Sequence, residues 1–399
     1  MSSKRERRAF GFRVGHVAGI DVHVDLSLAI VFSLIVFSLG TGLFPSWHPD
    51  WGPFVTWATA LAAALLFFTS ILIHELSHAL VGRAQGIPIS AITLFLFGGI
   101  AKLEREPHAW RAELWMAIAG PIASLVLGLV FLVLGGMFAG PVDFADGERA
   151  LAALSPTATL LLWLGPVNII LAVFNLVPGF PLDGGRVLRA ILWGITGDLL
   201  RATLWASKLG QAFAWLLIVA GVGMMLGLRV PLFGSGLFPG MWLALIGWFL
   251  NNAALMSYRQ LLVSEALEEV PVSRLMRRDV LTVHPDMRID VLVDECLMQG
   301  DQRGFPVIDN GKLLGLVCLE DIRKIPRQVW HATPVRDIMT PAERLSTIAM
   351  DADAAEALQR LSRLSVNQLP VIDDGELEGL IRREDILKWL SLYGNDERI

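Results

Sequence analysis

Six long apolar segments are the feature that most restricts what this chain can fold into. Each is about 20 residues long, the length that an α-helix needs to cross the roughly 30 Å hydrocarbon core of a bilayer. Hydrophobic residues make up 54% of the sequence and charged residues only 18%, against about 25% charged in soluble domains. This pattern predicts a polytopic α-helical protein of the lipid bilayer with about six transmembrane helices, and excludes a disordered or ordinary soluble chain. The segments are residues 26–44, 56–73, 114–138, 157–177, 204–226 and 237–256.

The distribution of Lys and Arg predicts the orientation in the cell membrane. Most basic residues of the membrane part lie in the N-terminal arm and in residues 83–111 and 186–208, whereas residues 45–53 contain none. Because positively charged loops stay in the cytoplasm, we expect a cytoplasmic N-terminus and, after six spans, a cytoplasmic C-terminal part. No small-residue cleavage site follows the first apolar segment, so we expect it to stay as an anchor.

Residues 87–104 are apolar but lack the pattern of a span. β-Branched residues and the pair Gly98-Gly99 favour a short hairpin or small membrane-associated β-sheet. Open sheet edges are not tolerated facing lipid. We therefore expect this sheet to be buried in protein, to line a cavity or to lie at the membrane interface.

The C-terminal part contains a sequence repeat with a period of about 63 residues. Each copy is typical of an α/β unit with the order helix, strand, strand, helix, because Pro-Val-Ile-Asp and a following Gly-Leu segment indicate a hairpin. Residues 263–399 carry a net charge of −8, so we expect a soluble unit with no nucleic-acid partner. The first copy contains 271–276, 304–309 and 315–322, and the second contains 334–339, 368–373 and 379–386.

This repeat resembles a tandem pair of CBS (cystathionine-β-synthase) motifs. Similar pairs bind adenosine nucleotides, and the resemblance implies ribose-binding carboxylates at Asp321 and Asp385. A hydroxyl residue usually stands three positions before each carboxylate, where this chain has Cys318 and Arg382. Two interpretations stay open: an adenosine-nucleotide sensor, or a packing and homodimerisation module in which each aspartate caps a helix.

We expect the second span to continue beyond residue 73 to Val81, and polar residues interrupt it at His74-Glu-Leu-Ser-His78. Residues four apart share one face of a helix, so His74 and His78 can bind one metal ion while Glu75 reaches a water beside it. Ionisable groups in a span cost about 2.5–3.5 kcal/mol each on insertion scales, and a zinc ion compensates for that cost. The alternative is a helix end with surface histidines.

A third zinc ligand is expected elsewhere, because catalytic zinc usually has three protein ligands and one water. The best candidate is Asp183, which follows the fourth apolar segment and should reach the same side of the membrane as the histidines. Pro178 and Pro181 predict an irregular backbone, which is tolerated at membrane depth where it lines a cavity. The alternative role for Asp183 is a helix N-cap.

His-Glu-x-x-His in one span and Asn-x-x-Pro-x-x-Pro-Leu-Asp-Gly-Gly two spans later resemble the site-2 protease family of intramembrane zinc metalloproteases. Six spans followed by a CBS pair resemble one bacterial and archaeal branch of it. The resemblance implies zinc ligands at His74, His78 and Asp183, a catalytic glutamate at Glu75 and a polar catalytic role for Asn175.

The same resemblance implies that the small sheet receives the substrate, with substrate-binding residues at Phe97, Gly98 and Gly99. Ser124 stands where a related motif often carries Asn. We expect the edge of the sheet to capture an unwound substrate strand by β-augmentation, with Glu75 as general base.

The leading hypothesis is an intramembrane zinc metalloendopeptidase that cleaves a transmembrane segment of a membrane-anchored protein, with the CBS pair as its regulator. The alternative from another class is a CBS-regulated ion or metal transporter, since intramembrane His and Asp can form an ion path; transport needs no general base such as Glu75. A pseudoprotease is disfavoured because every metal and base position is filled. The expected domains are a transmembrane zinc metalloprotease domain, 1–262, and two CBS domains, 271–326 and 334–390.

Overall fold

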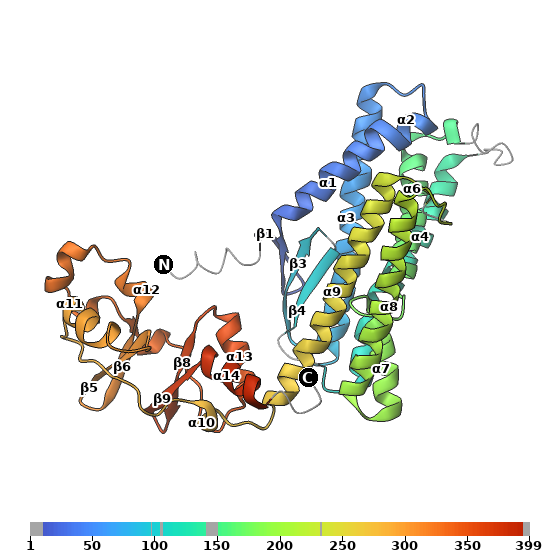
Figure 1. Ribbon diagram of the computed structural model, residues 1–399. Coiled ribbons are helices and arrows are strands. Elements are labelled where there is room, and N and C mark those ends of the chain that lie inside the picture. Colours follow the sequence, from blue (N-terminus) through green and yellow to red (C-terminus); the bar gives the residue numbers. More distant parts are fainter. Residues whose placement is uncertain (1–10, 97, 104–106, 141–150, 232–233, 394–399) are drawn as a thin grey trace. The chain divides into compact units, whose positions relative to one another are not determined.

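The chain forms two units, Met1–Tyr258 and Arg259–Ile399. A computed structural model describes residues 11–96, 98–103, 107–140, 151–231 and 234–393. The first unit contains the long helices, and Figure 1 shows α3, α4 and α6 running side by side. Its elements are β1 (Phe12–Val17), β2 (Ile20–Val24), α1 (Leu26–Ser38), the π-helix η3 (Leu39–Leu43), α2 (Phe44–Trp47), α3 (Pro53–Ala84), β3 (Ile89–Phe95), β4 (Gly98–Leu103), α4 (Trp110–Ala139), α6 (Pro156–Asn175), α7 (Asp183–Thr196) and α8 (Leu199–Met225), followed by α9 (Leu237–Leu267), which crosses into the second unit.

The polytopic α-helical class is confirmed. Among the described residues, five helical segments are long and apolar enough to cross a membrane, and they match the first five predicted spans. The sixth predicted span lies in α9, a helix of 31 residues that is not one of these five; Asn251-Asn252 interrupt its apolar sequence. The five segments are Leu26–Trp47, Pro53–Ala84, Trp110–Ala139, Pro156–Asn175 and Leu199–Met225.

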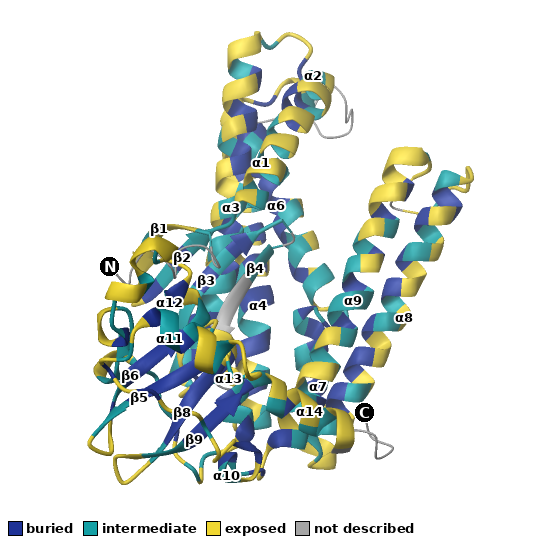
Figure 2. Cartoon of the chain, turned by 60° about the vertical axis from the view of Figure 1, so that its left-hand side comes forward, coloured by how far each residue is buried: buried dark blue, intermediate teal, exposed yellow. Residues whose placement is uncertain are grey.

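Large apolar side chains cover the outer faces of these helices, which Figure 2 shows as exposed. Val219 on α8 is 67% exposed and Val133 on α4 is 63% exposed. Such a surface is unfavourable in water, whereas lipid tails solvate it without cost. The helices pack on each other through small or polar side chains instead, among them Ala117, Gly120, Ser124 and Gly128 of α4, all buried.

The predicted hairpin at 87–104 is formed by β3 and β4, which pair antiparallel with Phe95 opposite Gly98. It is half of a four-stranded sheet with the order β1-β2-β3-β4, in which β2 pairs parallel to β3. The two N-terminal strands, β1 and β2, were not predicted from the sequence. One face of the sheet packs on α3 and α4 through a buried apolar cluster that includes Ile20, Ile92, Ala79 and Met116. The sheet is therefore fixed against the helix that carries the paired histidines.

The second unit contains the two predicted strand pairs. Both hairpins are antiparallel, and both have an irregularity at the same place in the repeat, between Val307 and Ile308 and between Val371 and Ile372. Its elements are α10 (Val272–Leu275), α11 (Ile289–Val291), η4 (Leu292–Leu297), β5 (Gly304–Asp309), β6 (Lys312–Cys318), α12 (Leu319–Ile322), η5 (Arg327–Ala332), η6 (Val335–Asp337), β7 (Thr340–Pro341), η7 (Ala342–Arg344), α13 (Ala354–Arg363), β8 (Gln368–Asp373), β9 (Glu376–Arg382) and α14 (Arg383–Tyr393).

The two repeats of this unit exchange their leading segments. Val272, at the start of the first repeat, is buried in the core that β8, β9 and α13 form, and its N–H donates to Ala352 O at 2.8 Å. Val335, at the start of the second repeat, is buried in the core around Phe305 and Val317 of β5 and β6. Each repeat thus completes the core of the other, so we expect the pair to fold as one unit.

Candidate metal centre

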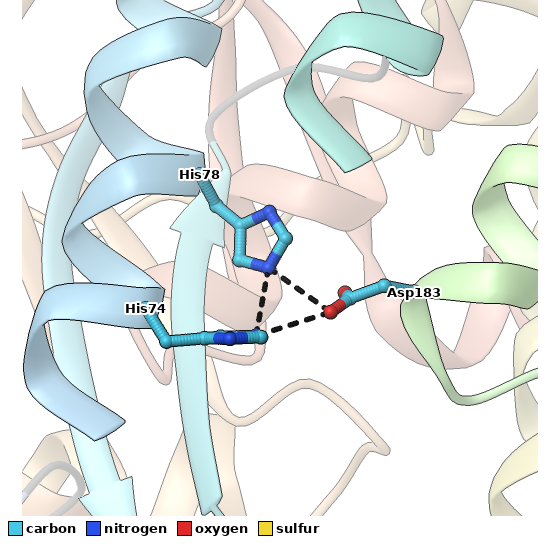
Figure 3. A group of neighbouring side chains, drawn as sticks. All are labelled: His74, His78 and Asp183. Carbon is cyan, nitrogen blue, oxygen red and sulfur yellow. Dashed lines mark hydrogen bonds and ion pairs between the residues drawn. The ribbon is translucent and has the colours of Figure 1, made fainter. Parts of the chain in front are cut away.

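His74, His78 and Asp183 converge on one point between α3 and α7 (Figure 3). Asp183 Oδ2 lies 3.1 Å from Nε2 of His74 and 3.1 Å from Nε2 of His78, and the two Nε2 atoms are also 3.1 Å apart. The side chains are nearly enclosed, with exposures of 4%, 11% and 18%. The three predicted ligands are therefore brought together, although 105 residues separate His78 from Asp183.

The other nitrogen of each imidazole is already engaged. His78 Nδ1 donates to the carbonyl oxygen of Met116 at 2.7 Å, and His74 Nδ1 lies 2.9 Å from the hydroxyl of Ser124. A hydrogen bond at Nδ1 fixes the proton there and leaves a lone pair on Nε2, which is the usual arrangement for a metal-binding histidine. Both partners come from α4, so this helix orients the two rings.

The donor set fits a zinc ion. Two imidazole nitrogens and one carboxylate oxygen are typical of catalytic zinc. A tetrahedral site with bonds of about 2.0–2.1 Å places its ligand atoms roughly 3.3 Å apart, close to the 3.1 Å separations found here. Without a cation, lone pairs on two Nε2 atoms and a carboxylate oxygen would repel one another. His74, His78 and Asp183 are thus the residues that would hold zinc.

Gly120 of α4 makes this approach possible. A Cβ at Gly120 would lie 2.2 Å from His78 Nε2 and 2.6 Å from His74 Nε2. Any larger residue would occupy the space in front of the ligand nitrogens. The absence of a side chain here lets α4 form one wall of the metal centre.

Glu75 lies on the sheet side of α3. A Cβ at Gly99 of β4 would come within 2.3 Å of Glu75 Cγ, so the start of β4 passes directly over this carboxylate. The predicted general base and the predicted substrate-binding glycine are therefore in contact range. Gly98 is the first residue of β4 and has a φ of +129°, and Phe97 lies outside the described residues.

Asn175 is the last residue of α6 and is half-buried. Its side chain makes no hydrogen bond to any residue that the structure describes. An unbonded amide eight residues before Asp183 is available to a ligand.

The two predicted ribose-binding carboxylates in the second unit are both engaged by residues of their own repeat. Asp321 Oδ2 accepts a hydrogen bond from Cys318 N at 3.2 Å, and Lys324 Nζ lies 2.5 Å from its Oδ1. Asp385 forms a two-point pair with Arg382, at 2.7 and 2.8 Å. The residues that replace the usual hydroxyls thus contact the aspartates themselves.

A buried ion pair close to the metal centre was not predicted from the sequence. Arg189 of α7 donates through Nε to Glu113 Oε1 of α4 at 2.7 Å, and its Nη2 also contacts this oxygen. Both side chains are almost fully buried. A glutamate at the start of an apolar segment was a signal, since an isolated charge there is costly, but its partner could not be found without the fold.

Both parts of the chain are similar to known proteins. The model of peptidase family M50 matches residues 62–217, and the CBS domain model matches 272–327 and 335–392. A candidate zinc metalloprotease of Synechocystis sp. is 35% identical over 95% of both chains. A zinc metalloprotease of Methanocaldococcus jannaschii is 27% identical, over 98% of this chain and 99% of its own. The solved site-2 protease of that archaeon is 27% identical over 63% of this chain and 96% of its own, with a TM-score of 0.42.

Proposed function

Because this chain belongs to peptidase family M50, the site-2 protease family of zinc metalloproteases, we propose that it cleaves a transmembrane segment of a membrane-anchored protein. The observation that carries this proposal is the convergence of Asp183, at the start of the short helix α7, with His74 and His78 of α3, a helix long enough to span the bilayer. A site on such a helix is reached most directly by a substrate that is itself in the membrane. Because the chain belongs to this family, we explain the same residues by peptide hydrolysis and not by transport of an ion or a metal.

Residues of this chain have separate roles in the proposed hydrolysis. When bound, zinc polarises a carbonyl oxygen and lowers the pKa of a coordinated water to about 7. Glu75 accepts a proton from the attacking water and delivers it to the leaving amine. Asn175, whose amide is not otherwise engaged, donates a hydrogen bond to the oxyanion that develops on the substrate.

Substrate capture is assigned to β4. Among the described strands β4 pairs with β3 alone, at the end of the sheet order, so no described strand covers its outer edge. A transmembrane substrate must unwind before its peptide bond can be cut, and an added strand on β4 would hold the unwound segment extended. The close approach of Gly99 to Glu75 supports this proposal, because a strand added to β4 would then lie near the proposed general base.

The test compares zinc content and cleavage of a model transmembrane substrate in detergent, for wild type and Glu75→Gln. We expect Glu75→Gln to keep zinc and to lose cleavage by roughly 100- to 10,000-fold, the range for general acid–base catalysts. The matched control is Ser77→Ala, two residues away on α3, whose hydroxyl donates to Ile73 O of the same helix. Full cleavage by Glu75→Gln would refute the proposed role.

We further propose that the CBS pair regulates cleavage from the cytoplasm and that Asp321 and Asp385 have packing roles. The contacts of Cys318, Lys324 and Arg382 with these carboxylates support that role. Deleting residues 271–399 should change cleavage but leave zinc content unchanged. The predicted homodimer is tested by comparing the masses of the full chain and the deletion variant in detergent. Saturable AMP binding by the full chain that is lost in Asp321→Ala or Asp385→Ala would instead establish an adenosine-nucleotide site.

The cytoplasmic position of the N-terminus and of the CBS pair rests on the distribution of Lys and Arg. Cysteine-specific labelling of intact cells at an introduced cysteine in the loop 45–53 tests it. We expect a membrane-impermeant reagent to label this cysteine. Protection of the cysteine from that reagent would mean that the protein has the opposite orientation in the membrane.

A further inference from the structure

The buried ion pair between α4 and α7 joins two helices that both contribute to the metal centre. Glu113 has no exposed side-chain surface, and Arg189 is 6% exposed. Two charges in so enclosed a place are unfavourable unless each satisfies the other. The contact is therefore well defined, because neither group can turn to water.

Arg189 also fixes the segment that leads into Asp183. Its guanidinium carbon lies 5.3 Å from the centre of the Phe180 ring, in cation–π range. Phe180 is buried and stands three residues before Asp183. One side chain thus connects α4, α7 and the connection that enters α7.

The α4 face that holds Glu113 is the same face that orients the histidines. Met116 accepts from His78, Gly120 faces both Nε2 atoms and Ser124 contacts His74. The spacing of three, four and four residues from Glu113 to Ser124 keeps all four on one side of the helix. Any movement of α7 relative to this face changes the distance from Asp183 to the two imidazoles.

We propose that Glu113 and Arg189 are the positioning residues of the metal centre. They set the distance of Asp183 from His74 and His78, and touch neither zinc nor substrate. This inference rests on the metal site of the proposed function but not on the substrate, so zinc affinity is measured apart from cleavage. Loss of partners outside the first ligand shell typically lowers metal affinity about 10- to 100-fold.

The experiment measures the zinc dissociation constant by competition with a chelator in purified full-length protein. Three variants are compared with wild type: Glu113→Gln, Arg189→Lys and the double variant Glu113→Gln/Arg189→Gln. The double variant matters most, because it removes both charges and leaves no unpaired buried ion that would prevent folding. We expect it to bind zinc about 10- to 100-fold more weakly than wild type while the metal-free protein unfolds at a similar temperature.

Arg189→Lys should give a smaller loss, because an ammonium keeps the charge but not the two-nitrogen contact. The matched control is Thr203→Val on α8, a fully buried polar residue whose hydroxyl donates to Leu199 O of its own helix; it should leave zinc affinity unchanged.

Wild-type zinc affinity in the folded double variant would overturn the proposal. Failure of the double variant to fold would also overturn it, because the pair would then be a general folding element. Weak zinc binding by the double variant, together with normal cleavage at saturating zinc, would support the positioning role. Absence of cleavage in wild type would refute only the proposed function.

Discussion

Ser124 Oγ of α4 lies 2.9 Å from His74 Nδ1. This contact gives a role to the residue that departs from the related motif, in which Asn often stands at the same position. A hydroxyl and a carboxamide can both accept from an imidazole N–H, so either residue can hold the ring with Nε2 towards the metal. Serine in place of asparagine therefore keeps a group at this position that can hold the His74 ring.

Ser124→Ala should weaken zinc binding by about 10-fold, because the His74 ring loses the bond that fixes its orientation. Ser124→Asn should retain more affinity than Ser124→Ala if the side chain fits. The measurement is the zinc dissociation constant by chelator competition. Equal affinities for wild type and Ser124→Ala would show that packing alone orients the ring.

Gly120→Ala should abolish zinc binding, because the added Cβ would lie 2.2 Å from His78 Nε2. Gly136→Ala is the matched control on the same helix, since a Cβ there meets nothing within 4 Å. Zinc content of the two purified variants by elemental analysis separates local blocking from a general effect of alanine in α4. Normal zinc content in Gly120→Ala would mean that α4 can move away from the site.

Gly99→Ala should keep zinc but reduce cleavage by at least about 100-fold, because its Cβ would displace Glu75, the general base. Gly15→Ala in β1 of the same sheet is the control, since its Cβ meets nothing within 4 Å. Cleavage rates and zinc content of both variants are compared with wild type. Loss of zinc in Gly99→Ala would instead indicate that the strand supports the histidines.

Cys318 should be unreactive at neutral pH. Burial, with a smaller contribution from the negative charge of Asp321, raises the pKa of its thiol to about 11. Since the thiolate is the nucleophile, alkylation of native Cys318 at pH 8 should be about 100-fold slower than in the unfolded chain, and should accelerate as the pH rises towards the folded pKa. The Cys296→Ala variant isolates this thiol for mass spectrometry. Equal rates in native and unfolded protein would contradict the raised pKa of this thiol.

Local sequence patterns were sufficient to predict the long helices, the β3–β4 hairpin and the repeat. His74, Glu75 and His78 are four residues apart or fewer, so helical geometry alone places them together. Asp183 could be paired with them because membrane topology limits how far apart two span ends on one side can be. The parallel pairing of β2 with β3 could not be predicted, because it joins strands separated in the chain by α1, η3, α2 and α3.

The sequence by itself determined which residues are candidates to hold a metal ion, because their types and spacing follow from helix geometry and from the cost of charge in a bilayer. Only the tertiary structure decided how those residues are held. The Met116 carbonyl, the Ser124 hydroxyl, the space at Gly120 and the Glu113–Arg189 pair all depend on how α4 packs against α3 and α7. Packing of this kind joins residues far apart in the chain, and no local pattern records which buried groups will meet.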